Sequence, residues 1–225
     1  MSTPAPGIIH LVRAMNIQKV LDVGANIGQF GRALLDQGYE GELISFEPLA
    51  ESFAELSAAS ADHPNWHCRQ LALGVEDGEA TLNISANRVS SSILPALPWS
   101  IEEHGPIAFV GQETVEIRRL DTLWHELPFQ GPPGPLMLKI DVQGFEPRVL
   151  AGLGERLGDV DLLLFEASLI PVYEGETAFE DLVSDMRNRG MYPVWIGAGW
   201  GSATTGQIFQ CDIAFAQQPL VRAST

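Results

Sequence analysis

The chain has 225 residues, of which 45% are hydrophobic, and it carries a formal net charge of −16 with a pI of about 4.5. This length suits one domain with a full core, and no apolar run is long enough to span a bilayer. The negative charge argues against nucleic acid and anionic membranes as partners, because phosphate binding needs clustered Lys and Arg. Residues 1–7 lack a basic stretch followed by an apolar one, so we expect no secretory signal and a cytoplasmic location.

In chain order, the first half of the sequence alternates strands and helices. Apolar periodicity predicts a helix within residues 1–17. Strands are then predicted at Lys19–Val23, Glu42–Phe46 and Trp66–Leu73, with helices at Gly28–Gln37 and Leu49–Ala59. This alternation is typical of a parallel sheet with helices on both faces.

The alternation breaks at residues 79–118. Predicted strands at Glu79–Ser85 and Thr114–Arg118 flank an irregular stretch, Arg88–Gly111, that still contains several large apolar residues. Long irregular segments in compact domains are usually functional or disordered, and the apolar residues favour a packed segment. We expect one domain over residues 1–225, with residues 79–118 inserted as a lid over the strand ends.

The second half resumes the pattern. Strands are predicted at Leu136–Asp141, Val160–Glu166, Met191–Ile196 and Ile208–Ala216, and helices at Phe145–Ala151 and Phe179–Arg189. The segment between the last two strands is too short for a crossover helix, so those strands must be antiparallel. The predicted fold is a Rossmann-like α/β fold with a seven-stranded, mostly parallel sheet and one antiparallel edge strand.

Residues 20–28 read VLDVGANIG, a strand that runs through a glycine turn into a helix. Glycine tolerates positive φ and lets the backbone pass close to a ligand, and the helix presents free N–H groups. Glu47 follows roughly 20 residues later, where a carboxylate at a strand end can take both ribose hydroxyls. The pattern predicts an adenosine-containing cofactor, bound by Gly24, Asn26, Gly28 and Glu47.

Asn26 distinguishes between two such cofactors. It stands where the dinucleotide fingerprint has its second glycine, the residue that lets the backbone approach a pyrophosphate. S-adenosylmethionine has no phosphate; it has a sulfonium and an amino-acid tail, whose ammonium Asp22 would hold directly or through water. We therefore favour S-adenosylmethionine, with a nicotinamide dinucleotide and an ordinary βα turn as the alternatives.

Four carboxylates are predicted at the carboxyl ends of the strands, where open α/β sheets bind ligands: Asp22, Glu47, Asp141 and Glu166. Acidic side chains are rarely buried without partners, so four on one rim indicate a site.

Lys139 lies in an apolar strand, two residues before Asp141 and therefore on the same face. A lysine there needs a carboxylate or a substrate to pair with. An ion pair with Glu146 or Glu166 is the purely structural alternative.

Residues 138–146 read LKIDVQGFE and resemble the signature K-I-D-V-E-G-x-E of the FkbM-type methyltransferases. Further segments fall in the family's order, at residues 22–28, 46–48, 72–74, 120–123 and 165–166. The resemblance spans about residues 18–216 and implies the class I methyltransferase fold, S-adenosylmethionine as cofactor with Leu73 in its site, and methylation of hydroxyls on sugars, macrolides and other small molecules. Gln143 stands where the family usually has Glu.

Methyl transfer to a hydroxyl requires in-line alignment and removal of the hydroxyl proton. Asp141 is the first candidate for the base, with Lys139 and Glu166 as further catalytic candidates; His104 and His125 are alternative bases. In a second mechanism, Asp141 and Glu166 hold a divalent cation such as Mg²⁺, which lowers the pKa of the hydroxyl.

Ser91, Ser92 and His104 belong to the predicted lid and are expected to contact the acceptor, although both serines also suit a simple turn. The expected partner is a small-molecule acceptor, not nucleic acid or a membrane, and the sequence leaves a homo-oligomer open. Three other classes stay open: a nicotinamide-dependent oxidoreductase, a non-catalytic cofactor-binding protein of the same fold, and a nucleic-acid amino-methyltransferase. The last usually carries an Asp/Asn-Pro-Pro-aromatic turn, where this chain reads DVQG at residues 141–144.

Overall fold

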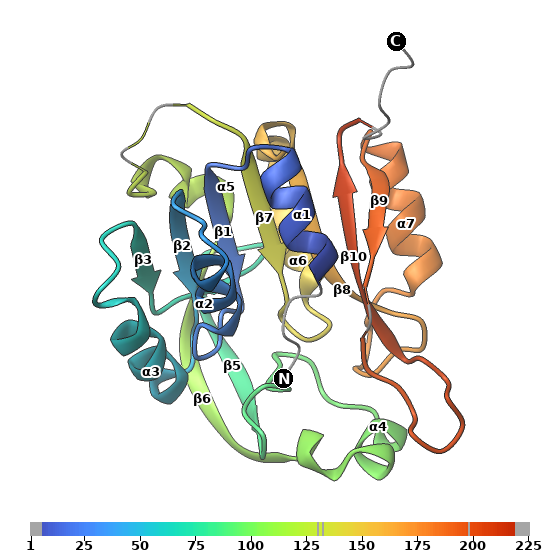
Figure 1. The fold of residues 1–225 in the computed structure, drawn as a ribbon. Helices are drawn as coiled ribbons and strands as arrows, with labels where there is room; N and C mark the ends of the chain where they lie inside the picture. Colours follow the sequence, from blue (N-terminus) through green and yellow to red (C-terminus); the bar gives the residue numbers. More distant parts are fainter. Residues whose placement is uncertain (1–5, 130, 132, 198, 219–225) are drawn as a thin grey trace.

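A seven-stranded sheet forms the centre of the computed structural model, which describes residues 6–129, 131, 133–197 and 199–218 (Figure 1). The strand order is β3-β2-β1-β7-β8-β10-β9. The strands are β1 (Lys19–Val23), β2 (Glu42–Phe46), β3 (Trp66–Arg69), β7 (Leu136–Ile140), β8 (Leu162–Ser168), β9 (Tyr192–Ile196) and β10 (Gln210–Ala216). The pairs from β3 to β8 are parallel, whereas β10 is antiparallel to both of its neighbours. The predicted fold class is confirmed, with the reversed strand lying between β8 and the edge strand β9.

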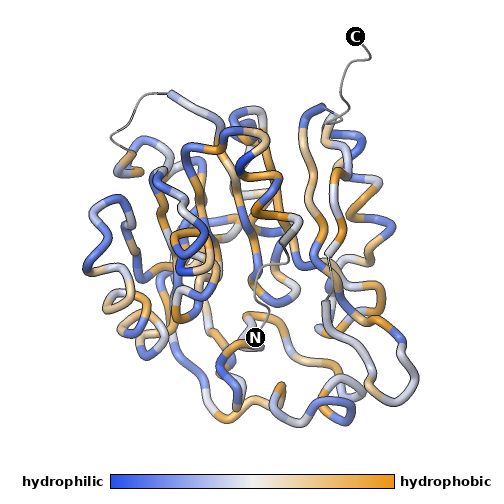
Figure 2. Tube along the Cα trace, in the orientation of Figure 1, coloured by the Kyte–Doolittle hydropathy of each residue, from blue (hydrophilic) through white to orange (hydrophobic). Residues whose placement is uncertain are grey.

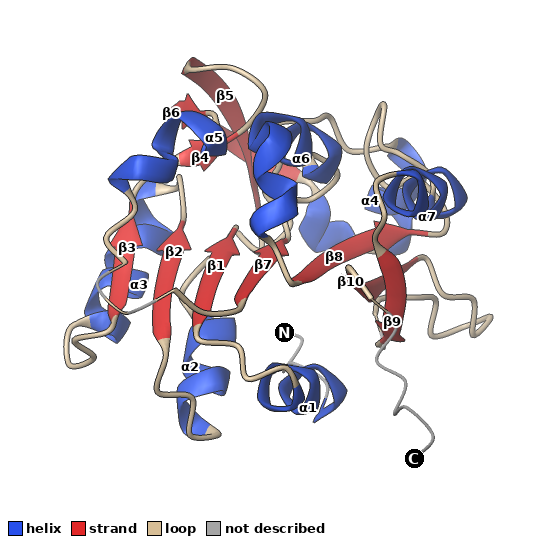
Figure 3. Ribbon diagram, turned by 90° about the horizontal axis from the view of Figure 1, so that it is seen from above, coloured by secondary structure: helices blue, strands red, loops and turns tan. Residues whose placement is uncertain are grey.

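Helices cover both faces of this sheet (Figure 3). One face carries α1 (Pro6–Ala14), α2 (Gln29–Asp36) and α3 (Ala50–Ser60), and the other carries α5 (Leu120–Leu123), α6 (Glu146–Leu153) and α7 (Phe179–Asn188). Short 3-10 helices lie at Gly105–Ile107, Trp124–Glu126 and Gly154–Asp159. No helix in the described part of the chain is long and apolar enough to cross a membrane.

The core has two layers because side chains alternate across each strand. In β7, Leu138 belongs to the cluster on the α6 face, while Met137 belongs to the cluster on the α1 face. Figure 2 shows hydrophobic stretches along the central strands and more hydrophilic residues in many of the connecting turns. The strands are therefore mostly apolar along their length, and the polar residues of the candidate site lie at their ends.

A second, three-stranded sheet has the order β4-β6-β5. It consists of β4 (Ala72–Leu73), β5 (Gly78–Ser85) and β6 (Phe109–Arg118). The predicted strand Trp66–Leu73 is thus divided, since its first half pairs with β2 and its last two residues pair with β6. β6 also begins earlier than predicted, because β5 pairs with it as far as Ser85 opposite Phe109.

The segment between β5 and β6 contains a helix that the sequence did not predict, α4 (Pro98–Glu103). In Figure 1, β5, β6 and α4 lie below the carboxyl ends of the central strands. Trp99 of α4 stacks on Trp200, with ring centroids 6.2 Å apart, and contacts the ring of Phe209 edge-on at 5.0 Å. Aromatic packing therefore joins this segment to the connection between β9 and β10.

Candidate functional site

The glycine turn after β1 lies against the end of β7. Gly24 has φ +76° and Asn26 has φ +49°. A Cβ atom on Gly24 would lie 1.8 Å from the carbonyl oxygen of Asp141. Only glycine allows this close approach, which places the end of β1 directly beside the backbone of Asp141.

Glu47, at the end of β2, is tied to this turn. Its Oε2 accepts a hydrogen bond from the backbone N–H of Asn26 at 2.9 Å, and its Oε1 accepts one from Leu49, also at 2.9 Å. The residue is only 5% exposed, and this burial raises the pKa of Glu47 to about 7 although both backbone donors favour the ionised form. The carboxylate is therefore held rigidly at the cavity described next.

One cavity brings together the glycine turn, the ends of β2 and β7, and the segment after β5. Seven of the predicted site residues line it: Gly24, Asn26, Glu47, Leu73, Ser91, Lys139 and Asp141. Apolar side chains from several elements complete the wall, among them Phe30, Leu71, Phe145 and Trp195. A mostly apolar cleft with a few convergent polar groups is the usual form of a small-molecule site.

Lys139 is paired with Asp22 and Asp141. Its Nζ lies 3.0 Å from Asp22 Oδ1 and 3.4 Å from Asp141 Oδ2. Burial alone would lower the pKa of Lys139, but these carboxylates outweigh burial and raise it, so the ammonium stays charged. The expected alternative, a pair with Glu146 or Glu166, is wrong, because Lys139 faces α2 and lies 5.5 Å from the ring of Phe30.

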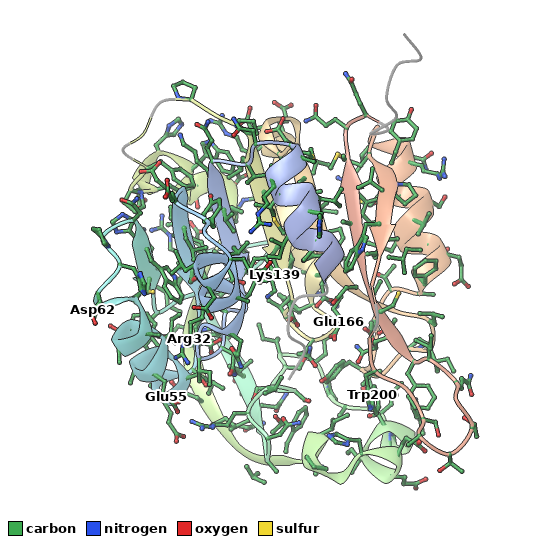
Figure 4. The ribbon with its side chains drawn as sticks, in the orientation of Figure 1. Arg32, Glu55, Asp62, Lys139, Glu166 and Trp200 are labelled. Carbon is green, nitrogen blue, oxygen red and sulfur yellow. The ribbon has the colours of Figure 1, made fainter. Side chains whose placement is uncertain are left out.

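Asp141 and Glu166 are bridged by Gln143. The Gln143 Nε2 donates to Asp141 Oδ1 at 3.0 Å and to Glu166 Oε2 at 2.6 Å. Tyr173 donates its hydroxyl to Gln143 Oε1 at 2.9 Å. Glu166 does not line the main cavity, and burial, reinforced by Asp141, raises its pKa. In Figure 4, Lys139 and Glu166 lie near the lower ends of β7 and β8.

Besides Glu166, four of the predicted site residues do not line the cavity. Asp22 is fully buried beneath Lys139 and contacts that ammonium rather than the cavity. Gly28 is the N-cap residue directly before α2, where a Cβ would contact Leu56 and Trp66. Ser92 is fully buried, with its hydroxyl donating to the Gln143 carbonyl at 2.6 Å, and His104 is exposed beside Trp200. The structure does not bring the Ser92 or His104 side chain to the cavity.

The model of the methyltransferase FkbM domain matches residues 22–191 of this chain. The chain belongs to the FkbM methyltransferase family. A curated relative, Methyltransferase 1 of Beauveria bassiana (strain ARSEF 2860), is 28% identical over 152 residues, which cover 63% of this chain and 60% of that protein. The chain thus spans about three fifths of the length of that relative.

Solved structures share the fold of this FkbM chain at low sequence identity. M. capricolum TrmK in complex with S-adenosylhomocysteine aligns with a TM-score of 0.52 and 5% identity, over 97% of this chain and 70% of that one. An rRNA methylase from Streptococcus thermophilus aligns with a TM-score of 0.50 and 10% identity, over 96% and 97% of the two chains. These likenesses establish the fold of this FkbM protein.

Three polar residues at or near the cavity were not predicted from the sequence. Asp212 on β10 and Arg88 after β5 line it, and Tyr173 supports it through Gln143. No sequence signal marked Tyr173, because it lies in an irregular segment and reaches Gln143 only in the folded chain. Like Lys139, Asp212 is a charged residue within an apolar strand, and this pattern could have identified it as a site residue from the sequence.

The stability of this FkbM protein is predicted to fall as pH rises from about 5 to 8. Burial raises the pKa of Glu146 to about 8, that of Glu47 to about 7 and that of Asp212 to about 6. Between the ordinary carboxyl pKa and its own raised value, each of these groups keeps its proton in the folded chain and loses it in the unfolded chain. Each therefore lowers the free energy of unfolding by up to about 1.4 kcal/mol per pH unit. Urea unfolding at several pH values measures the trend.

Glu146→Gln provides the matched control for this trend. Glu146 Oε1 accepts hydrogen bonds from the backbone of Val142 at 2.9 Å and Gly144 at 3.3 Å, and a glutamine oxygen can accept the same bonds without ionising. The variant should show a flatter dependence on pH. A wild-type free energy of unfolding that is constant or rises over this interval would contradict the prediction.

Proposed function

We propose that this chain is an S-adenosylmethionine-dependent methyltransferase that methylates a hydroxyl oxygen of a small molecule such as a sugar, a macrolide or another natural product. The observation that carries the proposal is a single cavity shared by the glycine turn, Glu47 and Asp141. Membership of the FkbM methyltransferase family supports the reaction class. The chain would act as one domain, with residues 79–118 as its lid.

The cofactor's parts match distinct groups on the cavity wall. Glu47 would accept the ribose hydroxyls, since each of its oxygens retains a lone pair beside the backbone bond that it already accepts. Leu73, at the end of β4, would contact the adenine, and the open turn at Gly24 and Asn26 would take the amino-acid tail. When bound, the sulfonium supplies a methyl group that is already electrophilic.

Asp141 would act as the base for the acceptor hydroxyl. Its side chain is 36% exposed on the cavity wall, where Lys139 approaches one of its oxygens and Gln143 donates to the other. Asp141 would take the hydroxyl proton as the acceptor oxygen accepts the methyl group, while the electron pair of the broken carbon–sulfur bond would remain on sulfur. Lys139 would position Asp141, and Glu166 would act through Gln143.

The residues present do not fit a divalent cation between Asp141 and Glu166. The Gln143 amide directs its hydrogens at both carboxylates, and an amide N–H is not a metal ligand. Within the described residues, no group of three or more His, Cys, Asp or Glu side chains is placed to hold a metal ion. The proposed reaction therefore uses no step through a metal.

A small-molecule acceptor is favoured over nucleic acid. The net charge of −16 opposes binding to a phosphate backbone, and the cavity wall is largely apolar. Ser91 contributes a hydroxyl to this wall, although it already donates to the Arg88 carbonyl at 2.9 Å. RNA is nevertheless included among the acceptors tested, because rRNA methylase and TrmK structures share the fold.

The test is a calorimetric titration with S-adenosylhomocysteine, with NAD as the comparison, each with and without magnesium. We expect the homocysteine product to bind in the micromolar range or tighter, NAD not to bind, and magnesium to have no effect. Binding of NAD alone would favour an oxidoreductase, and binding of neither would refute the proposal. A following screen with labelled S-adenosylmethionine would compare sugars, macrolides and tRNA; methylation of tRNA alone would refute the acceptor class.

A further inference from the structure

Gln143 is held in place by its backbone. It has φ +57° and is followed by Gly144 with φ +91°, so two consecutive residues adopt the left-handed conformation. The Gln143 carbonyl accepts the Ser92 hydroxyl at 2.6 Å, and Glu146 accepts the N–H of Gly144. These contacts fix the origin of the Gln143 side chain, which is 9% exposed.

The orientation of the Gln143 amide follows from its three partners. The amide nitrogen with its two hydrogens faces Asp141 and Glu166, and the amide oxygen faces the Tyr173 hydroxyl, which also has the Ser90 carbonyl within reach as an acceptor at 3.1 Å. The reverse orientation would direct the amide oxygen at two carboxylates, which have no hydrogens when ionised. The amide therefore uses both of its donors at once.

In this arrangement, amide N–H donors stabilise the two neighbouring carboxyl groups, as a cation between them would. Asp141 and Glu166 approach one nitrogen at 3.0 and 2.6 Å, and two carboxyl groups this close to each other need positive charge, hydrogen-bond donors or a retained proton between them. The Gln210 amide also donates to Glu166 Oε2 at 3.2 Å, and Lys139 approaches the other oxygen of Asp141. Donors thus already occupy the space between the carboxylates that a cation would need.

We propose that Gln143 takes the place of a divalent cation between Asp141 and Glu166, and that this single residue makes the site metal-independent. A glutamate at this position, which the family signature usually has, would remove both hydrogens and bring a third carboxylate to the pair. Carboxylate oxygens are ligands that suit Mg²⁺ and Mn²⁺, and a third carboxylate would add negative charge and ligand atoms at one point. Gln143 is accordingly a positioning residue for Asp141.

The experiment measures Mn²⁺ binding by electron paramagnetic resonance and calorimetry in the wild-type chain, Gln143→Glu, and the double variant Gln143→Glu with Glu166→Gln. The wild type should bind no stoichiometric Mn²⁺. Gln143→Glu should bind one ion per chain with an affinity at least about tenfold higher than the wild type, and the double variant should lose that gain. The double variant is the matched control because it retains the new carboxylate and removes one of its partners.

Two outcomes would overturn the proposal. The first is stoichiometric Mn²⁺ binding by the wild type that Asp141→Asn abolishes, and this result does not depend on whether Gln143→Glu folds. The second is a Gln143→Glu variant that has a native circular dichroism spectrum and gains no Mn²⁺ affinity.

An activity measurement separates positioning from general structural support. Once an acceptor is known, wild-type turnover should be unaffected by EDTA, whereas Gln143→Glu should lose turnover in EDTA and regain it with Mn²⁺. A merely structural role for Gln143 would produce a loss of turnover that metal does not restore.

Only the role of Asp141 as base rests on the proposed function. Mn²⁺ binding needs neither acceptor nor cofactor, so its failure is distinct from failure to bind S-adenosylhomocysteine.

Discussion

Replacing Asp141 with Asn is expected to lower turnover by about 10²–10⁴-fold, the usual contribution of a general base. Affinity for S-adenosylhomocysteine should change by only a few-fold, because the cofactor's ribose and adenine would be held by Glu47 and Leu73. An asparagine oxygen can still accept the Gln143 amide, and Lys139 retains its pair with Asp22 at 3.0 Å. Steady-state kinetics and product calorimetry together measure the two effects.

The control for this variant is Glu180→Gln, which also neutralises one carboxylate but lies exposed in the first turn of α7. It should leave both turnover and binding unchanged. Full turnover in Asp141→Asn would remove this residue as the base. A loss of cofactor affinity as large as the loss of turnover would reassign Asp141 to cofactor binding.

Replacing Glu47 with Ala should weaken binding of S-adenosylhomocysteine by roughly 2–3 kcal/mol, which corresponds to about 30- to 150-fold in the dissociation constant. The physical reason is the loss of two hydrogen bonds to the ribose, which are charge-assisted above about pH 7, where the Glu47 carboxyl is ionised. Glu47 sits at the cavity with 5% exposure, so water compensates poorly for the missing carboxylate. Calorimetric titration gives the constant directly.

Glu47 also holds the backbone of Asn26 and Leu49, so a second variant is needed to separate ligand contact from loop support. Glu47→Gln keeps the size of the side chain and can accept one of these backbone bonds, but it lacks the charge. It should lose part of the affinity, and its thermal stability should fall less than that of Glu47→Ala, which accepts neither backbone bond. An unchanged dissociation constant in both variants would remove Glu47 from the cofactor site.

Local features of the sequence account for much of the predicted fold and part of the predicted site. The alternating strands and helices, the glycine turn and the motif at residues 138–146 depend on short-range periodicity and on backbone conformations that few residues adopt. Gly24 illustrates the point, since its positive φ and its contact with the Asp141 carbonyl both exclude a side chain. The family resemblance drawn from these segments is confirmed by the domain match.

The partners of the polar side chains depended on tertiary structure. An ion pair of Lys139 with Glu146 or Glu166 was the structural alternative, but Glu146 begins α6 on the opposite face of the sheet, and Lys139 pairs with Asp22 across β1 and β7 instead. The register of neighbouring strands decides such a pair, and spacing along one strand cannot reveal it.

The sequence by itself therefore determined the α/β fold, the glycine turn and the strand-end carboxylates, because each follows from the periodicity and conformation of nearby residues. Only the tertiary structure decided how Gln143 is used. Tyr173 reaches it from 30 residues away, Ser92 from 51, and Glu166 from a neighbouring strand. Packing of distant segments brings these groups within hydrogen-bonding distance, and this packing places an amide between the two carboxylates.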